Sequence, residues 1–284
     1  MRINGREIAQ HIREKLELRV EKLRKQNIIP RLAVIKIGND PATTAYVNQK
    51  QKVAEKTGIQ VSIYDYPETA SEQEVSEKLQ TLDKDKTIHG IILQLPIPHH
   101  LDQEKLLLMI NPKKDIDGFH PQTTFVTPLA EAVIEILKYI HFHKDPLEEI
   151  PFEIWLQTRE IVVLGKGKTG GQPVTTCLRN MHLHPTVIDR QTKHPEQLLK
   201  QADIIICAVG KQHLLTKEQI KQGVILIGIG MNKGVDGKFY GDYNEEEIKD
   251  IASWYTPIPG GVGPVNVVKL LENAVIAAEK IRNC

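Results

Sequence analysis

A glycine-rich segment behind a short apolar run carries the clearest chemical signal in the sequence. Residues 161–164 (IVVL) have the bulky, β-branched character of a buried parallel strand. Gly165, Gly167 and Gly170 then follow at the spacing GxGxxG, which allows a tight turn, close approach of backbone to a pyrophosphate, and close packing of helix on strand. A helix starting near Gly171 would direct its free N–H groups at that anion. The segment therefore predicts a nucleotide site.

The strand predicted next ends in two charged residues. Asp189 lies 24 residues after Gly165, where an acid in dinucleotide sites binds the ribose hydroxyls of NAD. Arg190 could instead bind the 2′-phosphate of NADP. A solvated Asp–Arg pair at a strand end is a third interpretation, and the sequence leaves all three open.

A tyrosine and a lysine share one face of a predicted helix in the first half of the chain. Tyr46 and Lys50 are four residues apart in the helix predicted over 41–57. Burial can lower a lysine pKa by about 3–5 units, which suits acid/base chemistry; a surface lysine beside a half-buried tyrosine is the plainer interpretation. Short-chain dehydrogenases also use YxxxK, but after their glycine fingerprint. Here the motif precedes the fingerprint by more than a hundred residues, so that family is excluded.

Three further segments could face a ligand. ILQLPIP places Gln94 near the end of a strand, where open α/β sheets bind ligands. PKKDIDGF holds Asp115 and Asp117 in a glycine-containing turn; such a pair could bind a hard cation, although a plain turn is the usual meaning. In IPGGVGP, residues 258–264, three glycines lie between prolines. That composition indicates unusual φ angles or close approach of backbone to a ligand.

The totals exclude several classes of protein. The 284 residues carry 37 Lys plus Arg against 36 Asp plus Glu, which gives no electrostatic argument for nucleic acid or an anionic membrane. The sequence has no apolar run of 18 residues and no apolar signal core, so we expect a cytoplasmic protein without membrane contact. Cys177, Cys207 and Cys284 are too scattered for a disulfide framework or a zinc site. We expect no metal, and Cys207 as a core residue.

Apolar periodicity alternates between helix and strand along most of the chain. It predicts helices over 6–26, 41–57, 72–82, 127–142 and 264–282, and strands over 32–37, 60–64, 88–95, 161–164, 186–188, 203–208 and 224–229. This order indicates an α/β protein with parallel sheets covered by helices on both faces. Residues 141–160 interrupt it with two prolines and mixed charge, and we interpret them as a linker or an excursion between two domains.

These blocks, in this order, resemble the bifunctional methylenetetrahydrofolate dehydrogenase/methenyltetrahydrofolate cyclohydrolases. The resemblance covers nearly the whole chain, and YVNQK, QLPIP, KDIDGF and PIPGGVGP are its most specific blocks. It implies a two-domain α/β fold with a cleft between the domains. A folate-binding catalytic domain would span 1–142 and be completed by a helix within 264–284, and a Rossmann-like nicotinamide-cofactor domain would span 143–263. It also implies a homodimer.

The resemblance assigns roles to individual residues. Lys50 would be the acid/base lysine, with Tyr46 positioning the folate and Gln94 hydrogen-bonded to the lysine. Asp117 would hold the amino-pyrimidine edge of the pterin through both oxygens. The folate cleft would also be lined by Leu95, Pro96, Pro259, Gly260, Gly261, Val262 and Gly263. The cofactor would be bound by Gly165, Lys166, Gly167, Thr169, Gly170, Gly171, Asp189, Arg190, Gly210, Gly230 and Met231.

The implied activity has two steps. Hydride passes from 5,10-methylenetetrahydrofolate to NADP or NAD, and water activated with help from Lys50 then opens the methenyl product to 10-formyltetrahydrofolate.

The chain departs from the family pattern at several positions of the cofactor half. In the glycine loop, Lys166-Gly167 replaces Arg-Ser and Gly170 replaces Val. At the ends of the following strands, Asp189-Arg190 stands in a shortened His-Ser-x-Thr stretch, and Gly228-Ile229-Gly230 replaces Asp-Val-Gly. In the catalytic half, the segment between Phe119 and Thr127 is shortened and Asn266 replaces a threonine.

Two alternatives to the bifunctional enzyme follow from these departures. One is an NAD-preferring dehydrogenase with weak or no cyclohydrolase activity, which Asp189 motivates. The other belongs to a different class: a folate-binding protein without catalysis. The intact set of Tyr46, Lys50, Gln94 and Asp117 argues against the latter.

Overall fold

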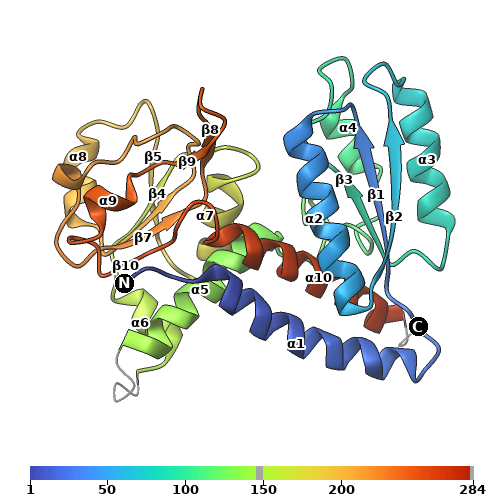
Figure 1. Ribbon diagram of the computed structural model, residues 1–284, viewed down its shortest axis with the longest axis horizontal. Helices are drawn as coiled ribbons and strands as arrows, with labels where there is room; N and C mark the ends of the chain where they lie inside the picture. The colour runs from blue at the N-terminus through green and yellow to red at the C-terminus, as the bar shows by residue number, and fades with distance from the viewer. Residues whose placement is uncertain (145–149, 282–284) are drawn as a thin grey trace. The chain divides into compact units, whose positions relative to one another are not determined.

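The structure is a computed structural model that describes residues 1–144 and 150–281 (Figure 1). Residues 145–149, inside the predicted linker, and 282–284, which include Cys284 and the end of the predicted last helix, lie outside the described residues. The chain forms two compact units that each combine early and late segments. We name them the lysine unit (Gln10–Pro128 and Val267–Cys284) and the glycine-loop unit (Met1–Ala9 and Leu129–Asn266).

The two compact units do not coincide with the domains expected from the sequence, whose boundaries near residues 142 and 264 remain a prediction. The compact units place residues 129–142 with the glycine loop, and they divide both the first and the last helix of the described chain, α1 (Gly5–Arg24) and α10 (Val262–Ile281). Each unit is therefore described separately below.

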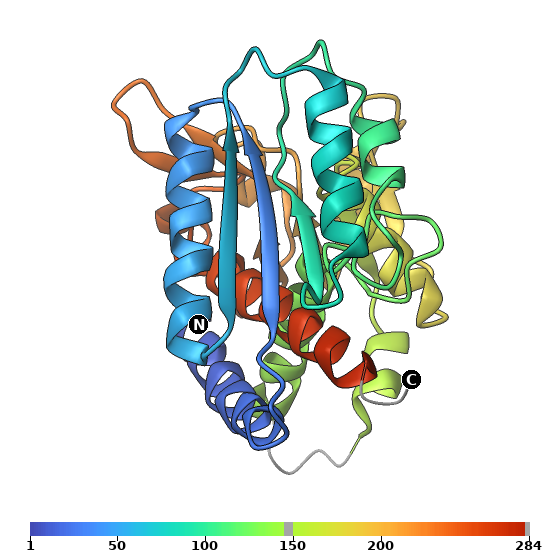
Figure 2. The same ribbon diagram turned by 90° about the vertical axis from the view of Figure 1, so that its right-hand side faces the viewer.

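The lysine unit is built on a parallel sheet. Among its described residues the strand order is β2–β1–β3, with β1 at Arg31–Ile37, β2 at Gln60–Tyr66 and β3 at Gly90–Leu93. Figure 2 shows the three strands side by side. Helices α2 (Pro41–Thr57) and α3 (Glu72–Lys84) cover opposite faces of this sheet (Figure 1), as the alternation of strand and helix predicts.

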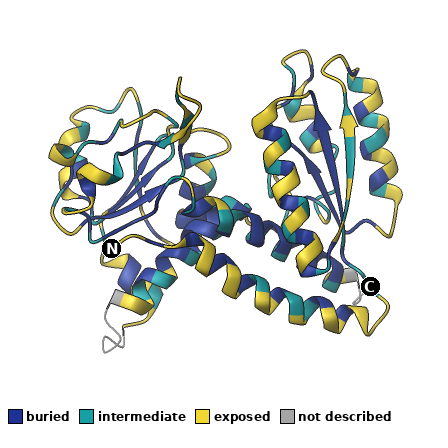
Figure 3. Cartoon of the chain, in the orientation of Figure 1, coloured by how far each residue is buried: buried dark blue, intermediate teal, exposed yellow. Residues whose placement is uncertain are grey.

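Residue alternation along β1 divides the packing between the two faces. Ala33, Ile35 and Ile37 share one hydrophobic cluster with α3 residues such as Leu79, and with Leu106 of α4 (Gln103–Leu108). Strands β1 and β3 are almost wholly buried, whereas β2 consists of exposed and partly buried residues. Exposed residues also lie on the outer surfaces of the helices (Figure 3). Burial on both faces explains why the segments of β1 and β3 read as nearly continuous apolar runs.

Local signals set the ends of α2, the helix that carries Lys50. Asp40 accepts a hydrogen bond from the Thr43 N–H at 2.7 Å, and Pro41 occupies the first turn, where its missing N–H costs nothing. Gly58 ends the helix in the left-handed conformation at φ 86°. The predicted range of 41–57 is confirmed.

The glycine-loop unit has a larger parallel sheet. Among the described residues its strand order is β10–β7–β6–β4–β5, and in chain order this is the doubly wound arrangement 2-1-3-4-5. Its strands are β4 (Ile161–Leu164), β5 (Thr186–Ile188), β6 (Ile204–Cys207), β7 (Ile225–Gly228) and β10 (Trp254–Tyr255). The strand order reverses between β4 and β6, and ligands of open α/β sheets bind beyond the carboxyl ends of the strands at that point.

Helices and short elements complete this unit. They are α5 (Pro128–Lys144), α6 (Phe152–Gln157), α7 (Gly171–Asn180), α8 (Pro195–Gln201), a 3₁₀ turn at Lys217–Gln219, the antiparallel hairpin of β8 (Met231–Lys233) and β9 (Phe239–Gly241), and α9 (Glu245–Ile248). Cys207 lies in the core of this unit with Ile205 and Leu226, as predicted.

Within residues 1–144 and 150–281, no helix combines the length and apolar character needed to cross a membrane.

Residues 141–160, interpreted from the sequence as a linker or an excursion between domains, contain the helix α6 in their described part. Its Trp155 and Leu156 are 1% and 0% exposed. Burial of a tryptophan anchors α6 to the glycine-loop unit. The strand predicted over 88–95 is also shorter, because β3 ends at Leu93, ahead of the polar Gln94.

Candidate functional site

Lys50 lies on the buried face of α2 and is 4% exposed. Thr43, Val47, Lys50 and Ala54 recur at helical spacing on that face, so the helix itself carries the amine into the protein. Its Nζ donates a hydrogen bond to Gln94 Oε1 at 3.0 Å and lies 4.8 Å from the centre of the Tyr46 ring. The amine thus has one neutral acceptor and one aromatic face as neighbours.

Gln94 is held in place from both its backbone and its side chain. Its N–H continues the sheet by donating to the Ile35 carbonyl at 2.8 Å, directly beyond the end of β3. Its Nε2 donates to the Leu95 carbonyl at 2.7 Å, which leaves Oε1 directed at Lys50. The Leu95–Pro96 peptide bond that follows is cis.

The turn that carries Asp117 is built by its neighbours. Asp115 is fully buried, and its two oxygens accept the N–H groups of His120 at 2.7 Å and Gly118 at 3.2 Å. These backbone donors satisfy the Asp115 carboxylate, which supports the turn interpretation over a cation site. From α10, Asn273 Nδ2 donates to the Ile116 carbonyl at 2.9 Å and so fixes the residue before Asp117.

Lys114 fastens the same turn to α3. Its ammonium donates to the carbonyls of Leu82, Asp83 and Asp85 at 3.0, 2.6 and 2.8 Å. A cation at the carboxyl end of a helix satisfies free carbonyl groups and complements the helix dipole. The position of Asp117 is therefore tied to both α3 and α10.

Burial perturbs the titrating groups of this site. It lowers the pKa of Lys50, and the negative charge of Asp117 counteracts that effect. It likewise raises the pKa of the Asp117 carboxyl, against the influence of Lys50. Burial also raises the pKa of Asp115 to about 6. Shifted acids and amines gathered in one place are typical of functional sites.

The glycine loop has the close contacts that its spacing predicts. Gly165 adopts φ 102°, a left-handed conformation that favours glycine. A Cβ on Gly171 would overlap the Gly165 carbonyl oxygen, so α7 packs directly against the turn after β4. A Cβ on Gly167, in contrast, would have nothing within 4 Å. In the described structure no side chain caps the first turn of α7, which suits an anion at that position.

A pocket of about 730 Å³ opens beside this loop, within the glycine-loop unit. It lies beyond the ends of β4, β5 and β6, at the position expected for a doubly wound sheet. Its volume falls within the range of about 300–1,000 Å³ typical of small-molecule sites. The lining includes the predicted Gly165, Lys166, Gly167, Asp189 and Arg190, and also Val209, Lys211, Leu214 and Gln219, which the sequence analysis missed.

Asp189 forms an ion pair with Lys166, and both residues line the pocket. Lys166 Nζ lies 2.5 Å from Asp189 Oδ2, and Asp189 Oδ1 accepts the Gln191 N–H at 2.8 Å. The hydrogen bond from Lys166 and that backbone donor lower the pKa of Asp189 to about 2. The pocket edge therefore presents a carboxylate that is ionised and already paired, with Arg190 next to it in the lining.

The other predicted cofactor residues are not in the pocket lining, but they adjoin lining residues or follow the strands that end at the pocket. Thr169, Gly170 and Gly171 lead into α7. Gly210, at φ 73°, lies between the lining residues Val209 and Lys211, and Gly230 and Met231 follow β7. A Cβ on Gly210 would lie 3.5 Å from the Met231 carbonyl oxygen. The residue that links these positions is Asp242, which the sequence analysis did not single out.

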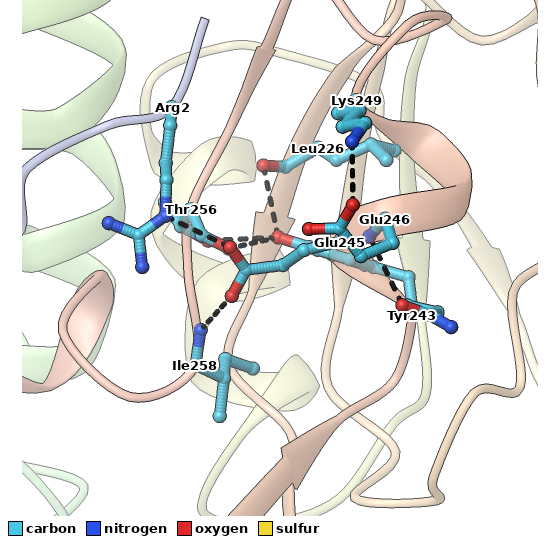
Figure 4. A network of polar contacts seen from close by, with 9 residues as sticks. Arg2, Leu226, Tyr243, Glu245, Glu246, Lys249, Thr256 and Ile258 are labelled. Carbon is cyan, nitrogen blue, oxygen red and sulfur yellow. Dashed lines mark hydrogen bonds and ion pairs between the residues drawn. The ribbon is translucent and has the colours of Figure 1, made fainter.

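The loop of Pro259, Gly260, Gly261, Val262 and Gly263 is anchored within the glycine-loop unit. Just before it, the Ile258 N–H donates to Glu245 Oε1 at 3.2 Å, and Glu245 Oε2 pairs with Arg2 at 3.0 Å (Figure 4). The Gly5 N–H donates to the Gly260 carbonyl at 3.1 Å. The extreme N-terminal residues thus help to shape this loop.

A buried hydroxyl supports the same segment. Tyr243 Oη donates to the Thr256 carbonyl at 2.6 Å (Figure 4). A Cβ on Gly228 would lie 3.1 Å from that hydroxyl and 3.0 Å from Ile258. At Gly228, where the family resemblance leads one to expect an aspartate, Tyr243 and Ile258 occupy the adjoining space.

The predicted site residues therefore fall into two groups. Lys50, Tyr46 and Gln94 are in mutual contact in the lysine unit, and the charge of Asp117 acts on Lys50 there. Leu95 and Pro96 follow Gln94 in that unit. The 259–263 loop and all predicted cofactor residues belong to the glycine-loop unit. The roles of individual residues stay predictions.

Comparison with known proteins assigns the segments that hold these two groups of residues to two domains of one protein family. A family model for the tetrahydrofolate dehydrogenase/cyclohydrolase catalytic domain matches residues 3–117, and one for the NAD(P)-binding domain of the same family matches residues 147–282. The chain is also 37% identical over 278 residues to the bifunctional protein FolD of Enterococcus faecalis, with 98% of each chain covered. The chain belongs to the tetrahydrofolate dehydrogenase/cyclohydrolase family. The resemblance inferred from its sequence motifs is confirmed.

Solved structures of the tetrahydrofolate dehydrogenase/cyclohydrolase family share the fold. The bifunctional enzyme FolD of Campylobacter jejuni superimposes with a TM-score of 0.91 at 33% identity, covering 99% of both chains. The Trypanosoma brucei FolD, solved with NADP cofactor and inhibitor, gives a TM-score of 0.90 at 28% identity over 100% of this chain and 99% of that one. The predicted two-domain α/β class, with a Rossmann-like NAD(P)-binding domain, is confirmed.

Proposed function

We propose that this protein is a bifunctional enzyme of one-carbon metabolism. It oxidises 5,10-methylenetetrahydrofolate to the methenyl compound with NAD(P), and it hydrolyses the methenyl compound to 10-formyltetrahydrofolate. The observation that carries the proposal is the buried Lys50 with its contacts to Gln94 and Tyr46, in a chain that matches both domains of the family. Its bifunctional relatives support both activities.

Lys50 is suited to the proton transfers of the second reaction. Because burial lowers its pKa, a larger fraction of the amine is neutral near pH 7 than in water. A neutral amine can take a proton from the water that adds to the methenyl carbon, and the resulting ammonium can protonate the departing ring nitrogen. Gln94 accepts one N–H of Lys50 and so directs the amine without adding a charge.

Tyr46 and Asp117 position the folate in this proposal. An ionised carboxylate can accept two N–H groups from the amino-pyrimidine edge of the pterin, and this bidentate pattern fixes the orientation of the ring. Tyr46, half-buried beside Lys50, offers an aromatic face for stacking. Leu95 and Pro96 supply apolar surface next to Gln94.

The residues of the glycine-loop unit fit a nicotinamide cofactor. The pocket volume, the positive φ of Gly165 and the close packing of Gly171 on Gly165 meet the steric requirements of a bound dinucleotide. Bound NAD(P)⁺ would supply the hydride acceptor for the first reaction. The amino end of α7 would face the pyrophosphate, and Asp189, Lys166 and Arg190 would face the adenosine ribose.

The choice between NAD and NADP depends on the Lys166–Asp189 pair. An ionised Asp189 favours the ribose hydroxyls of NAD and repels a 2′-phosphate, whereas Lys166 and Arg190 would attract that phosphate. Because Lys166 is already neutralised by Asp189, we favour NAD as the better substrate. The pocket admits both cofactors in this proposal.

The quaternary structure and location are part of the proposal. We infer a homodimer that acts in the cytoplasm on a small-molecule folate. Gel filtration with light scattering would test the dimer: a single species at twice the 32.1 kDa chain mass is expected, and a monomer at micromolar concentration would contradict it.

One pair of assays tests the function. Purified protein is mixed with methylenetetrahydrofolate plus NAD or NADP, and separately with the methenyl compound alone, and both reactions are followed by absorbance. We expect both rates to exceed the uncatalysed rates. Oxidation without hydrolysis would support the monofunctional dehydrogenase, and failure of both with retained folate binding would support a folate-binding protein.

A further inference from the structure

Beneath the loop after β6 lies a buried carboxylate that neither the sequence motifs nor the comparisons assign to a function. Asp242, the residue after β9, is 0% exposed. Its Oδ1 accepts the Lys211 N–H at 2.8 Å and its Oδ2 accepts the Val209 N–H at 3.1 Å. The Gly210 N–H also bonds to this carboxylate. One side chain therefore binds three consecutive backbone donors.

These donors belong to a wall of the nucleotide pocket. Val209 and Lys211 line the pocket on either side of Gly210, which has φ 73°. The loop leaves the carboxyl end of β6, next to the point where the strand order reverses. Its conformation consequently sets part of the shape that a dinucleotide meets.

Gly230 shows that the fold makes room for this carboxylate. A Cβ on Gly230 would overlap both Asp242 Oδ2 and the Gly210 nitrogen. The resemblance assigns Gly230 to the cofactor site, and the structure gives a reason that needs no contact with the cofactor: glycine admits the Asp242–loop contact. Burial raises the pKa of Asp242 and the N–H bonds oppose that shift. A buried carboxylate is unfavourable unless hydrogen bonds compensate it, and here the loop supplies them.

We propose that Asp242 is a positioning residue for the nicotinamide cofactor, which fixes the Val209–Lys211 wall of the pocket before the cofactor binds. The inference rests on the proposed function, since it requires NAD(P) in this pocket. It has a second consequence. The three N–H groups are taken by the carboxylate, so the pyrophosphate is bound by the glycine loop and α7 rather than by this loop.

Asp242→Asn tests the proposal directly. An asparagine has one acceptor oxygen, and its NH₂ group would face a backbone N–H, so the loop loses part of its support. The cofactor must then order the loop itself, and we expect the Kd for NADP and NAD, measured by calorimetry, to rise roughly tenfold to a hundredfold. The KM for the cofactor should rise more than kcat falls. Methenyl hydrolysis, which uses no cofactor, should stay within about twofold of wild type.

Asp203→Asn is the matched control. Asp203 also accepts a backbone N–H, from Glu160 at 2.8 Å, in the same unit, but it is not among the residues that line the pocket. We expect its cofactor Kd to match wild type. A folded Asp242→Asn protein with wild-type cofactor Kd would overturn the positioning role, even if wild type oxidises methylenetetrahydrofolate. A wild-type protein that catalyses neither reaction would instead defeat the proposed function.

A second measurement needs no variant and covers the case in which Asp242→Asn does not fold. Amide hydrogen exchange of the wild-type protein without cofactor should be slow at Val209, Gly210 and Lys211, compared with the exposed Val235 in the β8–β9 hairpin. Exchange at the three amides as fast as at Val235, with protection only after NADP is added, would show that the loop is ordered by the cofactor. That result would overturn the proposal.

Discussion

Lys50 Nζ and Gln94 Oε1 lie 3.0 Å apart, the first on the buried face of α2 and the second just beyond β3. The acceptor is an amide, so it orients the amine without stabilising its charged form as a carboxylate would. Burial therefore lowers the pKa of Lys50, and Gln94 does not add to the opposing effect of the Asp117 charge. The pair thus combines a positioned amine with a pKa below its ordinary value.

Replacing Lys50 should separate catalysis from binding. Lys50→Met retains most of the side-chain volume but cannot transfer a proton. We expect methenyl hydrolysis to fall by roughly 10²–10⁴-fold, the contribution typical of acid/base catalysis. The Kd of the folate, measured by calorimetry, should change by only a few-fold, since Asp117 and Tyr46 remain.

Lys36→Met provides the control for this experiment. Lys36 is equally buried in the same unit, but it donates to the Gly38 carbonyl and pairs with Asp65 at 2.8 Å. Its replacement should leave the rate of hydrolysis near wild type once stability is accounted for. Wild-type hydrolysis in Lys50→Met would remove Lys50 from the mechanism.

The neutral charge of Gln94 gives a prediction about pH. Gln94→Glu would place a carboxylate beside Lys50 and raise its pKa by about 1–3 units. The amine then stays protonated to higher pH, so the alkaline rise of the hydrolysis rate should move upward by that amount. A pH–rate profile would show it, and an unshifted profile would mean that Lys50 does not set the rate.

Asp115 should make the stability of the protein depend on pH. Burial raises its pKa from 3.8 to about 6, which corresponds to about 3 kcal/mol. The folded state binds this proton more tightly than the unfolded state, so the stabilisation is complete below pH 3.8 and is lost as pH rises through 6. The free energy of unfolding of wild type minus that of Asp115→Asn should fall by roughly 2 kcal/mol between pH 4 and pH 7. Urea titrations at several pH values would measure it.

Asp85→Asn should behave in the opposite sense. The pKa of this exposed carboxyl is lowered by hydrogen bonds from Thr87. The stability that the ionised Asp85 carboxyl contributes is therefore present at pH values above the ordinary pKa of an aspartate, and it is lost as the pH falls. For the Asp115 prediction, the contradicting outcome is a difference in the free energy of unfolding between wild type and Asp115→Asn that stays constant from pH 4 to pH 7. Asp115 would then not titrate in that range.

The Lys166–Asp189 pair should control cofactor preference. Asp189→Ser removes the carboxylate that repels a 2′-phosphate and leaves Lys166 unpaired at the pocket edge. We expect the ratio of kcat/KM for NADP to that for NAD to rise at least about tenfold, which corresponds to about 1.4 kcal/mol. Asp203→Ser, which breaks the ion pair with Lys221 in the same unit, should leave the ratio unchanged. An unaltered ratio in Asp189→Ser would rule out Asp189 as the selectivity residue.

Local signals made much of the fold predictable. Asp40, Pro41 and Gly58 fix both ends of α2, and the GxGxxG spacing placed the turn between β4 and α7. The prediction that Tyr46 and Lys50 share a face needed only helical geometry. The family motifs then joined Gln94 and Asp117 to them, although no local pattern links these four positions.

The missed features depend on contacts that are distant in sequence. Asp242 binds backbone groups 31 and 33 residues earlier, and nothing near Asp242 in the sequence marks that contact. Trp155 lies in a short helix whose flanking prolines and charges resemble a linker. The Lys166 partner of Asp189 is brought near only by the parallel pairing of β4 with β5. Such features require the three-dimensional arrangement.

The discontinuous composition of the two units has a consequence for biosynthesis. Asn273 of α10 binds the carbonyls of Ile116 and Val126, and the Tyr255 N–H donates to the Met1 carbonyl. A ribosome delivers the turn of Asp117 well before it delivers Asn273. Neither unit can acquire its full set of contacts while the nascent chain is still short, so the site around Lys50 should mature only after Asn273 has left the ribosome.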